Sequence, residues 1–118
     1  MPNIIELPER PIGVADIVML TTNGDGSCAV AYNNGGGSTS FNTVKTVAEV
    51  ITLANVDGVR LIPVTTTDGN NRGVNAARIN NGHVNNLGQT DLTLNWSGTS
   101  TVIHVTDTLA SVIAAANA

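Results

Sequence analysis

The sequence predicts an α+β fold made of two copies of a β-β-β-α unit, with antiparallel sheets covered by two short helices. Residues 46–55 recur as residues 108–117, and six of the ten aligned positions are identical. Alternating apolar residues upstream of each copy indicate strands. An internal repeat of this kind determines the architecture, because each copy is one supersecondary unit. We therefore predict one domain over residues 1–118 with pseudo-twofold symmetry, and a closed barrel and two packed sheets fit the pattern equally well.

The first twelve residues predict an extended N-terminal arm that is rich in proline. Proline fixes φ and has no N–H, so three prolines at positions 2, 8 and 11 argue against a helix or a central strand. The apolar side chains between them either wrap around their own domain or dock on a neighbouring molecule, and both outcomes are open. The candidate interface residues of the arm are Ile4, Ile5 and Leu7.

The first unit is predicted to span residues 13–57, as three strands followed by a helix. Its first strand lies in residues 17–24, and the next carries apolar residues at alternate positions 28, 30 and 32, which line one face. Residues 33–37 are asparagine and glycine, which supply the positive φ of a hairpin connection to a strand at 38–43.

Both predicted helices carry their own start signal and apolar face. Thr46 followed by Glu49 matches a capping box, in which the two side chains bond free backbone N–H groups. Apolar residues spaced by three, four and seven then form one stripe in each copy. Helices of about three turns are not stable alone in water, so each stripe must dock on the strands. Asn55 and Asn117 follow the stripes, where asparagine tolerates a left-handed conformation.

The second unit is predicted to span residues 58–118 and to differ from the first by an insertion at about 72–88. One gap brings its apolar positions 92, 94 and 96 level with 28, 30 and 32, and residues 61–69 resemble residues 17–24. The insertion reads as a hairpin with a tight turn at Asn81–Gly82. Flat, weakly patterned strands invite pairing with another chain, although a solvated loop is the other interpretation. The candidate interface residues here are Ala77, Ile79 and Val84.

The amino-acid composition limits what the core can be made of and which partners the surface can bind. A chain of 118 residues supports one core, and with 3% aromatic residues that core must consist of Val, Ile, Leu and Ala. Charged residues make up 12%, about half the usual share, which leaves a neutral polar surface suited to packing against other subunits. The net charge is −4 with five Lys and Arg residues, which argues against a duplex-DNA binder.

No pattern predicts catalytic, cofactor or metal chemistry, so we expect no enzyme. The single Cys28 excludes an internal disulfide and a multi-cysteine zinc site. Neither His83 nor His104 has a cysteine or carboxylate beside it at ligand spacing. The Asp- and Asn-containing runs at 23–26 and 68–71 lack the bidentate acid that ends a calcium loop, and they read as turns.

The sequence also bears on location. No apolar run is long enough to span a membrane, and the N-terminus lacks the basic-then-apolar pattern of a secretory signal. We therefore expect the protein in the cytoplasm of a host cell or in a virion.

Two resemblances bear on function. Duplicated antiparallel units with a C-terminal helix resemble Whirly and Pur-type proteins, whose sheets hold single-stranded nucleic acid. This chain departs from them in having three predicted strands per unit where they have four, and few of the basic and aromatic residues that base stacking requires. The Asn-, Thr- and Gly-rich, lysine-poor sequence resembles small structural and accessory proteins of marine bacteriophages. The function expected is therefore that of a non-enzymatic structural or assembly protein forming homo-oligomers, and the alternative is a single-strand nucleic-acid binder.

Overall fold

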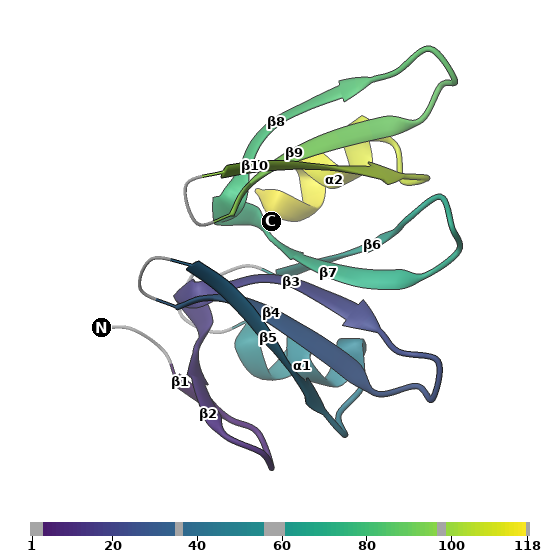
Figure 1. The fold of residues 1–118 in the computed structure, drawn as a ribbon. Coiled ribbons are helices and arrows are strands. Elements are labelled where there is room, and N and C mark those ends of the chain that lie inside the picture. Colours follow the sequence, from purple (N-terminus) through teal and green to yellow (C-terminus); the bar gives the residue numbers. More distant parts are fainter. Residues whose placement is uncertain (1–3, 35–36, 56–60, 97–98, 118) are drawn as a thin grey trace.

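A computed structural model describes residues 4–34, 37–55, 61–96 and 99–117. These residues form an α+β fold of mostly antiparallel sheets with two α-helices (Figure 1). The N-terminal half contains β1 (Ile4–Glu6), β2 (Pro11–Gly13), the 3-10 turn η1 (Val14–Asp16), β3 (Ile17–Thr22), β4 (Cys28–Asn34), β5 (Gly37–Thr43) and α1 (Val47–Ala54). The C-terminal half contains β6 (Leu61–Thr65), β7 (Asn71–Asn75), the 3-10 turn η2 (Ala76–Arg78), β8 (Ile79–Val84), β9 (Thr90–Trp96), β10 (Thr99–Val105) and α2 (Leu109–Ala116).

The order of a 3-10 turn, three strands and a helix occurs twice. The shift that aligns residue 46 with residue 108 also aligns the first and last residues of each element from η1 to α1 with those of the corresponding element from η2 to α2. We call this shift the repeat offset. We call η1 to α1, with Asn55, the first unit, and η2 to α2, with Asn117, the second unit. A hairpin precedes each unit: β1–β2 precedes the first and β6–β7 precedes the second.

This constant offset changes the predicted alignment of the two halves. Because β8 corresponds to β3 and β9 corresponds to β4 without a gap, Cys28 lies level with Thr90, and no insertion at 72–88 is needed. The predicted hairpin is wrong, since Asn81 and Gly82 both lie inside β8. A Cβ on Gly82 would approach the Cδ1 atom of Leu109 to 3.1 Å. This glycine therefore lets α2 pack closely on the strand instead of forming a turn.

The strands form three open sheets, with β1 paired to β2, the order β10-β9-β8, and the order β5-β4-β3-β7-β6. In the five-stranded sheet, β7 of the second hairpin pairs with β3 of the first unit. Figure 1 shows the β6–β7 hairpin lying between the two units. The hairpin that precedes the second unit thus completes the sheet of the first.

Two apolar clusters form the core, where the sequence favoured one shared core. β3 contributes Ile17 and Leu20 to the first cluster, and Val18 and Met19 to the second. The β6–β7 hairpin is likewise divided, because Leu61 joins the first cluster whereas its neighbour Ile62 joins the second. The two clusters are therefore held together by strands that face both.

The predicted helices over residues 46–54 and 108–116 are confirmed, and so is the capping box. The Thr46 hydroxyl accepts the Glu49 N–H at 3.2 Å, and the Glu49 carboxylate accepts the Thr46 N–H at 2.9 Å. The left-handed ends expected at Asn55 and Asn117 are wrong, because their φ angles are −82° and −101°. Asn55 instead bonds the backbone of Leu61 through its side chain.

The N-terminal segment forms the β1–β2 hairpin in place of a wholly extended arm. Ile5 and Leu7 are each 6% exposed and belong to the first core cluster, so the arm wraps its own domain at these positions. Pro11 is accommodated because it begins a strand at a sheet edge. The sequence also predicts a hairpin connection at 97–99 and a turn between the two units at Asp57–Gly58. That turn, residues 35–36 of the predicted connection 33–37, and residues 97–98 lie outside the described residues. No described helix is long and apolar enough to cross a membrane.

Candidate interface at the edge strand β8

The junction between the first unit and the β6–β7 hairpin shows how an edge of this fold is covered. β3 and β7 run antiparallel, with Leu20 opposite Gly73 and Thr21 opposite Arg72. A Cβ on Gly73 would approach Leu20 Cδ1 to 3.0 Å and Ile51 Cδ1 to 3.2 Å. A Cβ here would make Leu20 and Ile51 shift by a few tenths of an ångström, so glycine favours this close approach of β7 to the strand and helix of the first unit.

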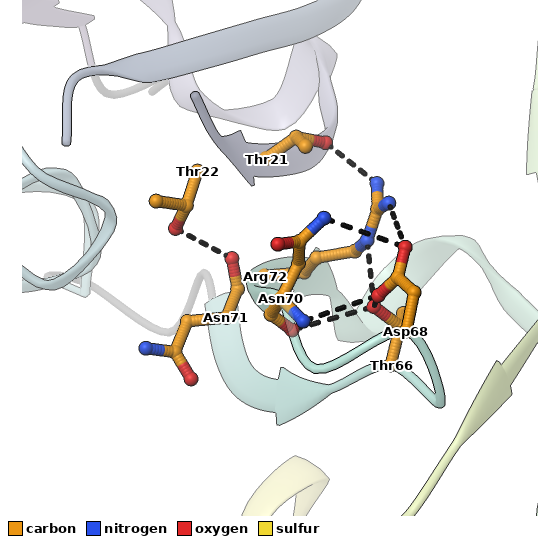
Figure 2. A network of polar contacts seen from close by, with 7 residues as sticks. All are labelled: Thr21, Thr22, Thr66, Asp68, Asn70, Asn71 and Arg72. Atoms are coloured by element: carbon orange, nitrogen blue, oxygen red, sulfur yellow. Dashed lines mark hydrogen bonds and ion pairs between the residues drawn. The ribbon is translucent and has the colours of Figure 1, made fainter. Parts of the chain in front are cut away.

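Polar side chains fasten the end of this junction (Figure 2). The Arg72 guanidinium donates to Thr21 Oγ1 at 2.8 Å and to Thr66 Oγ1 at 3.1 Å. The Thr66 hydroxyl donates in turn to Asp68, which lowers the pKa of that carboxyl, and the Arg72 charge acts in the same direction. Thr22 Oγ1 donates to the Asn71 carbonyl at 2.7 Å. Figure 2 shows that these contacts join β3 to the hairpin at this end.

Leu61 closes the apolar side of the junction. It is completely buried in the first core cluster. The Asn55 side chain holds its backbone at two points, accepting the Leu61 N–H at 2.7 Å and donating to the Leu61 carbonyl at 2.9 Å. The end of α1 therefore fixes both the side chain and the main chain of this residue.

The corresponding surface of the second unit is open. β8 is one of the two edge strands of the three-stranded sheet, and a groove of about 270 Å³ lies between it and α2. The residues that line the groove are Ala76, Ile79, Gly82, Leu92, Leu109, Val112, Ile113, Ala116 and Asn117. At the repeat offset, their counterparts in the first unit are, in the same order, Val14, Ile17, Leu20, Val30, Val47, Val50, Ile51, Ala54 and Asn55. All of the first-unit set apart from Ile51 and Asn55 share the core cluster of Leu61, and Ile51 packs against it.

Exposure and hydrogen bonding show the same difference. Ile113 is 51% exposed, whereas its counterpart Ile51 is less exposed and packs against the first core cluster. The Asn117 side chain has no hydrogen-bond partner among the residues that the structure describes, whereas Asn55 holds Leu61. The groove is therefore the second unit's counterpart of the site that Leu61 fills in the first.

The six residues predicted for an interface divide into three groups. Ile79 lines the groove, and Val84 and Ala77 are exposed near the two ends of β8. Ile4 is 65% exposed on β1. Ile5 and Leu7 are buried in their own core, so they are not available to a partner. Gly82, Ile113 and Asn117 were missed, although an ungapped repeat offset could have found them.

The register of the second sheet places a carboxylate between the two histidines. Asp91 on β9 lies opposite His83 on β8 and opposite His104 on β10. His104 Nδ1 is 2.5 Å from Asp91 Oδ1, and His83 Nε2 is 3.5 Å from Asp91 Oδ2. The pKa of Asp91 is lowered, first by the hydrogen bond to His104 and then by that from Asn85. No sequence spacing reveals this row, because strand register alone creates it.

This row is a polar contact that crosses the three strands β8, β9 and β10. The protein groups bonded to Asp91 are the two histidines and Asn85, and no serine or cysteine joins them among the described residues. Burial raises the pKa of the Cys28 thiol to about 11, so this residue is not an activated nucleophile. The described residues contain no group of three or more His, Cys, Asp or Glu side chains that could hold a metal ion.

A second hollow, of about 480 Å³, lies where α1 faces the β6–β7 hairpin. Its charged groups already bond protein atoms: Arg72 joins the junction network, and Asp107 accepts the Thr65 N–H at 2.7 Å. The remaining lining is made of threonine and aliphatic side chains, with Gly26 and the amide residue Asn71. The β8 edge with its groove is therefore the surface that most clearly lacks a partner.

Comparisons with protein families, curated proteins and solved structures give no match to this chain.

Proposed function

We propose that the chain is a non-enzymatic structural or assembly protein that acts through self-association, in the manner of small bacteriophage virion or accessory proteins. The observation that carries this proposal is the open β8 edge beside an apolar groove. A strand edge with unpaired backbone groups next to apolar side chains is a surface that favours the addition of another strand. The neutral polar character of the rest of the surface supports it, since little charge must be desolvated on contact.

We also infer that the two units are copies of one ancestral unit. The support is the repeat offset, which is constant from η1 to α1, together with the hairpin that precedes each unit. The sequence favoured a pseudo-twofold relation, in which equal surfaces would meet. The contact between β3 and β7 instead joins unlike surfaces, because the counterpart of β3 is β8 and that of β7 is β2. This supports a head-to-tail relation between the units.

The three arginines among the described residues argue against the single-strand nucleic-acid alternative. Arg10 donates to the Tyr32 hydroxyl and lies 4.7 Å from the centre of the Phe41 ring. Arg72 is held in the junction network, and Arg78 donates to the Ala15 carbonyl. These three cations and the Tyr32–Phe41 ring pair are thus already engaged within the chain.

Sedimentation of the full chain over a range of concentrations tests the proposal, with a parallel titration against labelled single-stranded DNA at low and moderate salt. We expect concentration-dependent association and no DNA binding. A monomer that binds DNA with a steep salt dependence would favour the alternative, since counterion release produces that dependence. A chain that stays monomeric and does not bind DNA would contradict both the self-association and the single-strand binding function.

A further inference from the structure

We propose that copies of this chain associate head to tail, with the β1–β2 hairpin of one copy adding to the β8 edge of the next. This inference rests on the proposed function and names the partner as a second copy. The open edge and the hairpin are the counterparts of two unlike surfaces that already meet inside the chain, where β6–β7 covers β3.

The two hairpins correspond residue by residue where they would make this contact. Ile12 on β2 and Val74 on β7 are counterparts, and each packs in the core of the unit that its hairpin precedes. Gly13 pairs with Ile4, as its counterpart Asn75 pairs with Leu61. Ile4 therefore occupies the position of Leu61, but it is 65% exposed whereas Leu61 is fully buried.

The groove of the second unit fits this exposed side chain. In the first unit, seven of the nine counterpart residues share a core cluster with Leu61, Ile51 packs against that cluster, and the Asn55 side chain binds the main chain of Leu61. Placing Ile4 of a second copy in the same position would cover Ile113. It would also bring the N–H and the carbonyl of Ile4 to the Asn117 side chain, as Asn55 already bonds those of Leu61. One exposed isoleucine and one open groove would be buried together, which favours association.

The register follows from the internal junction. Replacing β3 by β8 and β7 by β2 at the repeat offset places Asn81 opposite Ile12, Gly82 opposite Pro11 and His83 opposite Arg10 of the second copy. Pro11 stands where β7 has Gly73, and proline cannot donate a ladder hydrogen bond. The contact between copies is therefore weaker than the internal junction, and association is reversible. A contact between unlike surfaces produces rings or filaments rather than only dimers.

Two exposed positions allow the surfaces to be disabled separately. Ile4→Asp places a charge on the hairpin and leaves the groove intact, whereas Ile113→Asp places a charge in the groove and leaves the hairpin intact. Both side chains are more than half exposed, so neither change should unfold the monomer, which melting curves verify. Deletion of residues 1–12 is avoided because it removes core residues Ile5, Leu7 and Ile12. Val102→Asp on β10, at a position 49% exposed, is the matched control.

Sedimentation equilibrium of these variants, alone and mixed, tests the proposal. Each of the two variants alone should associate about tenfold to hundredfold more weakly than the unmodified chain, the loss expected for one buried isoleucine contact, and Val102→Asp should associate normally. An equimolar mixture should form one-to-one dimers and nothing larger, because one intact hairpin meets one intact groove.

The possible failures are distinguishable. Association of the unmodified chain that neither substitution weakens would overturn the head-to-tail contact and leave self-association standing. Two weakened variants that form no mixed dimer would also overturn it, since a contact between unlike surfaces must be rescued by mixing. An unmodified chain that stays monomeric at all concentrations would reject this inference and the proposed function together.

Discussion

The two units of this protein have the same elements in the same order, but one is covered and the other is open. In the first unit, β3 is paired on both sides and Leu61 is sealed beneath α1. In the second unit, β8 is an edge and Ile113 of α2 is half exposed. The strand that covers the first unit comes from the β6–β7 hairpin, which follows that unit in the sequence. An element can thus belong to one unit in sequence and complete another in space.

The largest expected effect separates Leu61 from Ile4, which has the equivalent pairing position in the other hairpin. Leu61→Ala leaves a cavity in a closed core and should lower the free energy of unfolding by about 2–5 kcal/mol. Ile4→Ala removes an exposed side chain and should change it by less than about 0.5 kcal/mol under dilute conditions. Urea unfolding of both variants measures the contrast. Equal losses would mean that the two positions are not in different environments.

A smaller contrast is expected between the asparagines that end the helices. Asn55→Ala leaves the N–H and carbonyl of buried Leu61 without partners and should cost about 1–3 kcal/mol. Asn117→Ala should leave the stability of the monomer unchanged, because its side chain holds nothing among the described residues. Thermal melts of dilute protein provide the comparison. A loss at Asn117 equal to that at Asn55 would contradict the open groove.

The helix caps sharpen the comparison further. Removing the hydroxyl cap by Thr46→Ala or Thr108→Ala should cost about 1 kcal/mol in either unit. Only α1 has the complete capping box, because Ser111 stands where α1 has Glu49. Ser111→Glu should therefore stabilise the second unit by a few tenths of a kcal/mol, about the size of one exposed cap interaction. Chemical denaturation would show the gain, and a loss on this substitution would argue against equivalent helix starts.

The smallest contrast concerns acid. Asp91, whose pKa is held below the ordinary value of 3.8 by His104, has Ala29 as its counterpart in the first unit. A carboxyl with a lowered pKa contributes stability above its unfolded pKa and loses that stability as the pH falls through the folded value. The stability difference between the unmodified chain and Asp91→Asn should therefore be fully present above about pH 4 and shrink as the pH falls further, through the lowered pKa of Asp91. Unfolding curves from pH 2 to pH 7 check this, and a difference that grows in acid would contradict the sign.

Local signals in the sequence predicted the helices, because the capping box and apolar stripe are complete within one short segment. A local signal gave the wrong prediction at Asn81–Gly82. This pair is typical of turns, but it lies inside a strand, where the glycine makes room for Leu109. The candidate site could not be predicted in this way. The site is an open strand edge whose covered counterpart is the pairing of β3 with β7. That pairing brings Thr21 to Arg72 from a distant part of the chain, and no short sequence pattern predicts it.

The exposed arm residues illustrate the same limit. Ile4 and Ile5 are adjacent apolar residues that composition cannot tell apart. The register of β1 on β2 sends Ile5 into the core and leaves Ile4 outside, since successive side chains of a strand point to opposite faces. Only a known register could have selected Ile4 as the residue available to a partner.

Amide hydrogen exchange along β8, measured at low and high protein concentration, tests the central claim most directly. If the hairpin of a second copy covers this edge, the outward amides of β8 should become protected as concentration rises. The edge amides of β5 in the five-stranded sheet should exchange at the same rate at both concentrations. Protection that appears at β5, or fails to appear at β8 while the chain is associated, would contradict the account.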